Sequence, residues 1–362
     1  MRNGSYTSTF KDGLLLLGKI ILVLVLVVVI NQLIYLAINP EYSWGSDKIH
    51  RKRMFLKPVA GMYNTMFLGD SKIGQSIIPQ EFDSIVNQNH PGEVSSFNFG
   101  IGSLSPPESY FLLEQLLSSD SIKLKYVIIQ LYDISIIGPR LIHTRRSIYW
   151  YTFAYYWFTV KSLIFSKDEL PRRLKALKNH TISYMEKILN MGFLADYSNF
   201  LAEEKNLDFN IKKEGYFSME FSTDPETVKK REEFLADSSN LINMREISLK
   251  QNYEQTQNAG SNIAHLEKIN KLIKICNAKG TKLIFLLSPN MGKKNNVVIQ
   301  LFNNIDPAHR IELSDAKKFP ELYRLGNSFD GKHFNLNGAR LFTKLLAQKF
   351  TELDAGKVRS EK

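Results

Sequence analysis

Three side chains that could together perform acyl transfer lie far apart along this chain. Ser71 stands in the segment FLGDSKIG, and Asp330 and His333 stand in the segment FDGKHFNLNG near the C-terminus. A serine hydroxyl is a weak nucleophile until a neighbouring base removes its proton, and histidine suits that role because its pKa lies near neutrality. A carboxylate then holds the imidazole in the useful tautomer and stabilises the imidazolium that forms. The three residues therefore predict a serine nucleophile, its base and the acid that orients the base.

The elements that would position these residues alternate between strands and helices. Short apolar runs predict buried strands at residues 63–68, 94–99, 125–133, 281–289 and 309–315. Helical patterns cover residues 76–88, 106–118, 262–278 and 293–304, and a last helix begins at Leu336 with Asn335 as its N-cap. This alternation predicts an α/β fold, a three-layer sandwich in which helices cover both faces of a mainly parallel sheet.

Parallel α/β folds bind ligands at the carboxyl ends of their strands, and the noteworthy polar residues lie there. Ser71 follows the first predicted strand, and Asn98 and Gly100 close the second. The backbone N–H groups of Ser71 and Gly100 are predicted to bind a developing oxyanion. Asn98 and Tyr132, at the ends of the second and third strands, are predicted to contact the substrate. Asp70 is interpreted as a turn residue whose carboxylate accepts backbone N–H groups.

The composition limits the chemistry further. Cys276 is the only cysteine, which excludes an internal disulfide and a cysteine-based zinc site. The histidines outside the C-terminal segment show no metal-ligand spacing, so we predict no catalytic metal and no cofactor. The net charge of +11 fits either a solvated basic surface or attraction to a polyanionic partner. Because no nucleic-acid-binding motif is present, an anionic membrane surface or an anionic envelope glycan fits this charge better than nucleic acid.

The N-terminus carries a segment that is long and apolar enough to cross a bilayer. Residues 13–38 read GLLLLGKIILVLVLVVVINQLIYLAI, and a span needs about 20 apolar residues if Lys19 snorkels to one interface. A cleaved signal peptide has the same basic-then-apolar order, but no A-x-A-like site follows, which favours an uncleaved anchor. The count of basic residues would place the following chain in the cytoplasm, whereas N-terminal anchors commonly lead long domains outward. We expect a single-pass membrane protein with an extracytoplasmic domain, in the bacterial periplasm or at the cell surface.

These observations divide the 362 residues into an N-terminal tail, a transmembrane anchor, a linker, a two-part catalytic domain and a helical insertion. Their ranges are 1–12, 13–38, 39–60, 61–138 with 256–355, and 139–255. The insertion contains a strongly aromatic run at residues 147–165. Three interpretations of this run stay open: the buried core of the insertion, a segment lying against the bilayer, or a surface that binds a sugar or a partner.

The motifs resemble those of the SGNH/GDSL hydrolase superfamily over roughly residues 60–135 and 260–350. The first block matches residues 67–74 with Ser71 as nucleophile, and the second matches residues 97–102 with Gly100 as oxyanion donor. The last block matches residues 329–342, with Asp330 and His333 as acid and base. The resemblance implies the SGNH hydrolase fold and a serine esterase or O-acyltransferase that works through an acyl-serine intermediate.

The third block departs from the family pattern, because Tyr132 occupies the position where the family usually has an oxyanion-donating asparagine. The same departure is similar to superfamily members that assist acylation of envelope polymers, in alginate O-acetylation and in D-alanine transfer to teichoic acids. Those members are also tethered by an N-terminal membrane segment. The resemblance therefore implies an envelope glycan as substrate, the membrane as a partner, and a multi-span membrane O-acyltransferase as a further partner. The alternative hypothesis is a catalytically silent scaffold or glycan-binding module in an envelope assembly.

Overall fold

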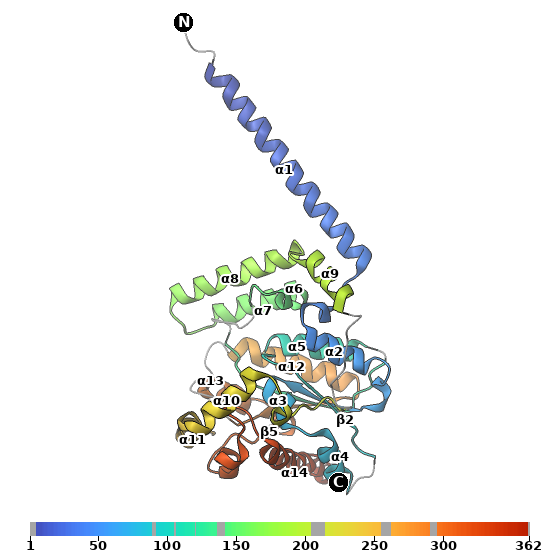
Figure 1. The fold of residues 1–362 in the computed structure, drawn as a ribbon, viewed down its shortest axis with the longest axis vertical. Coiled ribbons are helices and arrows are strands. Elements are labelled where there is room, and N and C mark those ends of the chain that lie inside the picture. Colours follow the sequence, from blue (N-terminus) through green and yellow to red (C-terminus); the bar gives the residue numbers. More distant parts are fainter. Residues whose placement is uncertain are drawn as a thin grey trace.

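A five-stranded, all-parallel sheet with the order β2-β1-β3-β4-β5 forms the centre of the protein (Figure 1). The strands are β1 Thr65–Gly69, β2 Ser96–Gly100, β3 Tyr126–Gln130, β4 Lys282–Leu287 and β5 Arg310–Glu312. The predicted α/β class with a parallel sheet is confirmed. The computed structural model describes residues 5–88, 92–104, 106–119, 121–135, 142–203, 214–254, 262–289 and 295–360.

Helices cover both faces of the sheet, which explains why the strands read as continuous apolar runs. Along β1, Met66 and Leu68 point into one hydrophobic core and Phe67 points into the other. One face packs against α3 Ser71–Ser76, α4 Pro79–Asn87 and α14 Leu336–Ser360. The other face packs against α2 Asp47–Leu56, α5 Glu108–Ser118, α12 Asn262–Ala278 and α13 Asn295–Asn303.

The helix expected over residues 76–88 is present as α4, and a further short helix, α3, precedes it with a break at residues 77–78. Pro79 causes the break, because a proline disfavours helical geometry in the residue before it. Ile78 is accordingly extended, with φ −96° and ψ 102°, and Pro79 stands in the first turn of α4. The break lets α3 start directly at Ser71, at the end of β1.

The described residues between 142 and 254 form no strand. They fold into α6 Arg145–Trp150, α7 Phe153–Ile164, α8 Leu170–Ile188, α9 Phe193–Glu203, α10 Pro225–Ala236 and α11 Ser239–Lys250, with a short 3-10 turn η4 Met219–Phe221. Helices α6 to α9 form a layer beyond α5 and α12, whereas α10 and α11 lie beside the C-terminal part of the chain (Figure 1).

The aromatic run divides between core and surface. Tyr149, Trp150 and Tyr151 are buried. Phe153 and Trp157 are exposed by 64% and 55%. The interpretation of the run as a buried core therefore holds for one side of the run only. The other side, on α7, is exposed, and for it the bilayer and binding-surface interpretations stay open.

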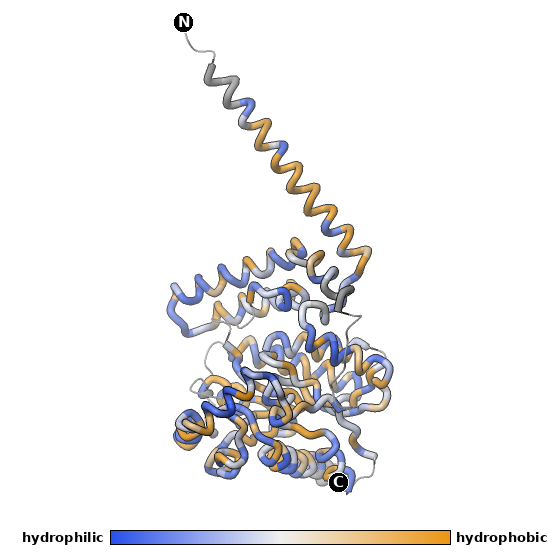
Figure 2. Tube along the Cα trace, in the orientation of Figure 1, coloured by the Kyte–Doolittle hydropathy of each residue, from blue (hydrophilic) through white to orange (hydrophobic). Residues whose placement is uncertain are grey.

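The N-terminal helix α1, Ser5–Ile38, extends away from the rest of the protein (Figures 1 and 2). Within Lys11–Ile38, the most apolar stretch of 18 residues has a mean hydropathy of 3.1 and is not buried, as in either a signal anchor or a signal sequence. The segment expected to be a linker is folded, as the 3-10 turn η1 Tyr42–Gly45 followed by α2. Ile49, Lys52 and Leu56 of α2 are buried, and their spacing puts them on one face of the helix.

A buried polar cluster joins this segment to the sheet domain and to α6. The Glu108 carboxylate accepts hydrogen bonds from the Tyr42 hydroxyl at 2.5 Å and from Arg146 Nε at 2.6 Å. Arg146 Nη1 also donates to the carbonyl of Gly102 at 2.9 Å. Because all three side chains are withdrawn from water, each depends on its partners for hydrogen bonding.

We expect Glu108→Ala to lower the free energy of unfolding by about 3–5 kcal/mol, because Arg146 would remain buried without its carboxylate. Glu226 is a matched control, since it pairs with Lys230 at 2.6 Å on the exposed surface of α10. Glu226→Ala should change stability little, because solvent screens exposed pairs. Urea unfolding followed by circular dichroism measures both, and equal losses in the two variants would contradict the assignment.

Candidate active site

Ser71, His333 and Asp330 form one hydrogen-bonded chain. Ser71 Oγ lies 2.9 Å from His333 Nε2, although the two residues are 262 positions apart. His333 Nδ1 lies 2.9 Å from Asp330 Oδ2 and 3.1 Å from Oδ1. The fold therefore brings together the three residues predicted as nucleophile, base and acid, with each imidazole nitrogen engaged by one partner. This arrangement can remove a proton from the hydroxyl and stabilise the resulting imidazolium.

A tight turn from β1 into α3 presents Ser71. Asp70 is the N-cap of α3, and its carboxylate accepts the Lys72 N–H at 2.9 Å, as its interpretation as a turn residue expected. Gln130 at the end of β3 accepts the Asp70 N–H at 2.9 Å. A Cβ at Gly69 would lie 2.6 Å from the Gln130 Oε1 atom, so this close approach requires glycine. The neighbouring strand thus holds the turn that carries the serine.

The turn from Asp330 to His333 is held by its own backbone. One Asp330 oxygen accepts the N–H groups of Lys332 and His333, each at 2.7 Å. Burial alone would raise the pKa of Asp330. The hydrogen bond and charge of His333 and the two backbone donors outweigh burial, and they hold this pKa below its usual value. Asp330 therefore stays ionised at neutral pH, as its orienting role requires.

Elements on both sides brace this turn. Asn335 caps α14, since its Oδ1 accepts the Gly338 N–H at 2.9 Å, which confirms the predicted N-cap. Arg231 of α10 donates to the carbonyls of Ser328 and Phe329. The helices from the middle of the chain therefore pack directly on the loop that carries the base.

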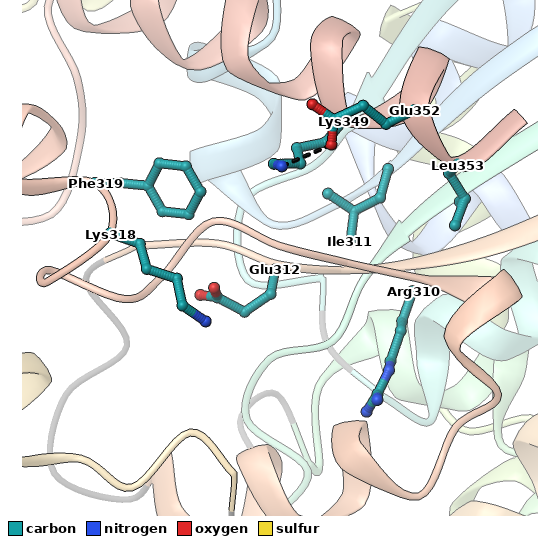
Figure 3. Close-up of a pocket in the computed structure, with 8 residues that line it drawn as sticks. All are labelled: Arg310, Ile311, Glu312, Lys318, Phe319, Lys349, Glu352 and Leu353. Carbon is teal, nitrogen blue, oxygen red and sulfur yellow. Dashed lines mark hydrogen bonds and ion pairs between the residues drawn. The ribbon is translucent and has the colours of Figure 1, made fainter. Parts of the chain in front are cut away.

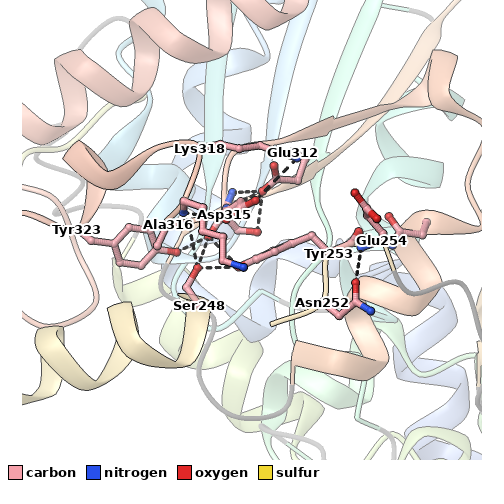
Figure 4. A network of polar contacts seen from close by, with 12 residues as sticks. Ser248, Asn252, Tyr253, Glu254, Glu312, Asp315, Ala316, Lys318 and Tyr323 are labelled. Atoms are coloured by element: carbon pink, nitrogen blue, oxygen red, sulfur yellow. Dashed lines mark hydrogen bonds and ion pairs between the residues drawn. The ribbon is translucent and has the colours of Figure 1, made fainter. Parts of the chain in front are cut away.

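A second polar network holds the segment between β5 and this turn (Figure 4). Ser248 of α11 donates to the Ser314 carbonyl at 2.8 Å and accepts the Ala316 N–H at 2.9 Å. The Tyr323 hydroxyl donates to the same Ser314 carbonyl at 2.5 Å. These contacts connect α11 to the chain that leads to Asp330.

The second predicted block, Asn98 to Gly100, has internal roles. Asn98 is fully buried, and its Nδ2 donates to the carbonyls of Ile73 at 2.8 Å and Ile77 at 2.7 Å. Its Oδ1 accepts the Gly100 N–H at 2.9 Å. A Cβ at Gly100 would lie 2.1 Å from the backbone nitrogen of Gly74, so the contact between β2 and α3 also requires glycine there. In this structure the predicted oxyanion donor at Gly100 is engaged by Asn98, and Asn98 holds the end of α3.

A cavity of about 330 Å³ opens beside Ser71. Its lining includes Ser71 with Gln75 from α3, Gly100 to Gly102 after β2, Lys48 with Arg51 from α2, and Tyr216 with Phe217 from the segment before η4. The Phe217 N–H donates to the Gly74 carbonyl at 3.2 Å, which fixes that segment against α3. The cavity therefore has one wall from the sheet domain and another from α2.

The buried side chain of Lys52 connects α2 to the sheet domain. Its ammonium donates to the carbonyls of Asn98 at 2.7 Å, Gly100 at 2.9 Å and Gly215 at 2.9 Å. Gly215 has φ +78°, and a Cβ there would lie 2.4 Å from the Asn98 oxygen. One buried cation thus gathers carbonyls from β2 and from the segment after the insertion.

Tyr132 lies apart from this cavity's lining. Its ring is partly buried against the core, and Lys72 Nζ lies 4.1 Å from its centroid, a cation–π contact. The predicted contact of Tyr132 with substrate remains a prediction. Within the described residues, no group of three His, Cys, Asp or Glu side chains could hold a metal ion.

A larger hollow of about 690 Å³ lies at the β5 edge (Figure 3). It is lined by Arg310, Ile311, Glu312, Lys318, Phe319, Lys349, Glu352 and Leu353. Lys349 and Glu352, one turn apart on α14, pair with each other at 2.7 Å. None of the three residues of the hydrogen-bonded chain lines this hollow, so it is not the candidate active site.

Sequence reasoning missed Lys52, Gln130 and the segment from Gly215 to Phe217. Lysine in the run DKIHRKR indicates a solvated helix face, and only its alignment with Ile49 and Leu56 could have signalled burial. Gln130 and Gly215 act through contacts with distant segments, which leave no local pattern.

Comparison with known proteins finds no matching family model, no matching curated protein and no matching solved structure. The site is therefore characterised by its geometry. The described residues contain a Ser–His–Asp hydrogen-bonded chain beside a cavity, at the carboxyl ends of parallel strands.

Lys52 also generates a pH prediction. Burial, followed by the charge of Lys48, lowers the pKa of Lys52 to about 7, whereas an unfolded lysine has a pKa of about 10.4. Above pH 7 folding therefore releases a proton, and the contribution of Lys52 to stability rises with pH. Between pH 7 and pH 9 the wild-type protein should gain about 2 kcal/mol relative to Lys52→Met. Urea unfolding at both pH values measures this difference, and the exposed Lys57 provides the control variant Lys57→Met.

An identical pH dependence for Lys52→Met and wild type would contradict the assignment of a buried, titrating Lys52. Lys57→Met should follow the wild-type curve, because an exposed lysine makes little difference to stability.

Proposed function

We propose that this protein is a membrane-anchored, extracytoplasmic serine esterase or O-acyltransferase of the SGNH type, acting on a cell-envelope glycan. The observation that carries the proposal is the hydrogen-bonded chain from Ser71 through His333 to Asp330, beside a cavity. The motif blocks support the SGNH assignment, since the first follows β1, the second ends β2 and the last precedes α14.

The reaction follows from the positions of the three residues. His333 Nε2 accepts the Ser71 proton while Oγ attacks the acyl carbonyl, and Asp330 stabilises the imidazolium. The imidazolium then protonates the leaving oxygen, and the acyl group stays on Ser71 as an ester. In the second half, His333 deprotonates an incoming hydroxyl, which attacks this ester and releases the acyl group, and the proton returns to Ser71. Water as the incoming group makes the enzyme an esterase, and a sugar hydroxyl makes it a transferase.

Oxyanion stabilisation distinguishes this site from an efficient esterase. The Ser71 N–H lies at the start of α3 and has no hydrogen-bond acceptor among the described residues. The Gly100 N–H would have to leave Asn98 to reach an oxyanion, and Tyr132 replaces the asparagine of the third block. A missing donor raises the barrier by about 2.7–4 kcal/mol, which favours slow turnover on simple esters.

Several features favour transfer to a polymer over hydrolysis. The apolar α1 would hold the enzyme where envelope glycans are assembled, and the segment from Gly215 to Phe217 adds to the lining of the cavity. Lys48 and Arg51 line the cavity and give its mouth cationic groups, although Arg51 also pairs with Asp47 at 2.7 Å. A cationic mouth suits an anionic glycan. A multi-span membrane O-acyltransferase remains the proposed donor partner, by family resemblance.

A serine-reactive fluorophosphonate should form a covalent adduct on Ser71, located by mass spectrometry of the full-length protein. His333→Gln should slow adduct formation by about 10²- to 10⁴-fold, because general-base catalysis supplies that factor. Ser166 is the control, since its hydroxyl meets the Asp168 carboxylate at 2.5 Å without a histidine. An adduct on Ser166 in preference to Ser71 would overturn the catalytic assignment.

The second candidate function is a catalytically silent scaffold or glycan-binding module. It is favoured by the engagement of the Gly100 N–H with Asn98 and by Tyr132 in the third block. In cells lacking the protein, Ser71→Ala at normal abundance should fail to restore envelope acylation if the protein is the enzyme. Full restoration by Ser71→Ala would support the scaffold instead.

A further inference from the structure

Helix α8 has its apolar residues on the outside. Its buried side carries Ala176, His180 and Ser183, which are small or polar. Its exposed side carries large apolar residues, with exposures of 41–57%: Leu170, Leu174, Ile182, Met185 and Ile188. A surface helix of a water-soluble domain turns its apolar stripe towards the core. Here the pattern is inverted, so the outward side of α8 is built for surroundings other than water.

The exposed apolar surface continues onto the two neighbouring helices. On α7, Phe153, Trp157 and Ile164 repeat at spacings of four and seven, and all three are exposed. At the start of α9, Met191 and Leu194 are exposed by 53% and 49%. Scattered apolar side chains are ordinary on a protein surface, but many large exposed ones on three adjacent helices mark a contact surface. We call this set, together with the exposed side of α8, the α7–α9 apolar face.

The end of α1 is bound to the corner where α8 meets α9. Asn31 Nδ2 donates to the Leu189 carbonyl at 2.6 Å, and Asn190 Nδ2 donates to Gln32 Oε1 at 2.7 Å. The ring of Tyr35 packs edge-on against Phe193, with centroids 5.2 Å apart. Helix α1 therefore leaves the protein at this corner (Figure 1).

The length of the apolar part of α1 sets where a bilayer would begin. The segment from Leu14 to Ile30 would extend about 25 Å at 1.5 Å per residue, close to the thickness of a hydrocarbon core. Asn31 and Gln32, the first polar residues after it, are the ones that bind the α8–α9 corner. If α1 spans the bilayer, the corner lies at the level of its headgroups, and α8 runs from that corner.

The charge of α8 indicates which kind of surface it meets. The helix contains one acidic residue, Glu186, against five basic ones: Arg172, Arg173, Lys175, Lys178 and Lys187. An anionic leaflet attracts basic residues at its surface by about 1 kcal/mol each. Arg173 donates to the carbonyls of Leu163 and Ile164, and Lys187 donates to the Tyr35 hydroxyl. The other three, Arg172, Lys175 and Lys178, are exposed. A helix that exposes both apolar and basic residues is typical of helices that lie in the plane of an anionic membrane.

We propose that the α7–α9 apolar face docks on the surface of an anionic bilayer, with α8 lying in the headgroup region. This inference rests on the proposed role of α1 as a membrane anchor. Docking adds a second contact with the lipid, so the anchored domain keeps one orientation. The cavity beside Ser71 then stays at a set height above the membrane, where a membrane-linked glycan or acyl donor can reach it.

Depth-resolved fluorescence quenching tests the docking with the full-length protein in phosphatidylglycerol-containing liposomes. Cys276 is buried, so the wild-type chain serves as the labelling blank. An environment-sensitive thiol dye is attached at Leu174→Cys or Met185→Cys, and nitroxide lipids provide the quencher. Leu235→Cys on α10 and Ile242→Cys on α11 are the controls, because their exposures of 58% and 57% match the test sites.

Shallow nitroxides should quench the dye at the two α8 sites at least about fivefold more strongly than at the control sites. The reason is that an interfacial helix is buried about 5–10 Å into the headgroup boundary. The charge-reversed pair Lys175→Glu with Lys178→Glu should reduce this quenching in anionic liposomes. Equal quenching at all four sites would overturn the proposal. A blue shift at Leu174→Cys without lipid quenching would also overturn it, by showing a protein occupant such as a second copy.

The design separates this inference from the proposed function. Alkaline extraction that releases the protein from liposomes shows that α1 is no anchor. Retention of the protein without quenching at α8 refutes the docking alone. Fluorophosphonate labelling of Ser71 in the same samples reports the catalytic proposal independently.

Discussion

The hydrogen bond between Ser71 and His333 is the contact on which the arrangement depends, because it joins two parts of the chain 262 positions apart. Ser71 is placed by a strand end, a glycine and the Gln130 side chain of the neighbouring strand. His333 is placed by the Asp330 turn and by the cap of α14. A distance of 2.9 Å leaves little tolerance, since a hydrogen bond weakens steeply with misalignment. Both halves must therefore be rigid.

The segments outside the sheet supply much of that rigidity. Arg231 of α10 holds the carbonyls beside the Asp330 turn, and Ser248 of α11 holds the chain leading to it. On the other side, Lys52 gathers three carbonyls around Gly100. The helical middle of the chain and α2 are thus parts of the site's support, although neither carries a residue of the Ser71–His333–Asp330 chain.

The sequence predicted the elements whose causes are local. Each strand is a continuous apolar run because both faces of the sheet are covered, and Asn335 and Asp70 cap helices through their own side chains. The misses have tertiary causes. Lys52 lies in a charged run that reads as solvated, and its burial depends on carbonyls from distant segments. The partners of the Asn98 side chain are carbonyls of Ile73 and Ile77, which sequence spacing does not reveal, and its expected contact with substrate stays a prediction.

The folded state of residues 42–56 changes what an anchor can do. A flexible linker would let the domain move freely above the membrane, whereas Tyr42 bonds to Glu108 and Lys52 bonds beneath the cavity. Helix α1 ends at Ile38, and four residues later, at Tyr42, the chain is already packed on the core. The position of the cavity relative to α1 is therefore set by packing. For the acyl transfer that we propose, with donor and acceptor held near a membrane, such a fixed position would replace a diffusional search by an oriented encounter, which is where much of the rate advantage of bound reactants arises.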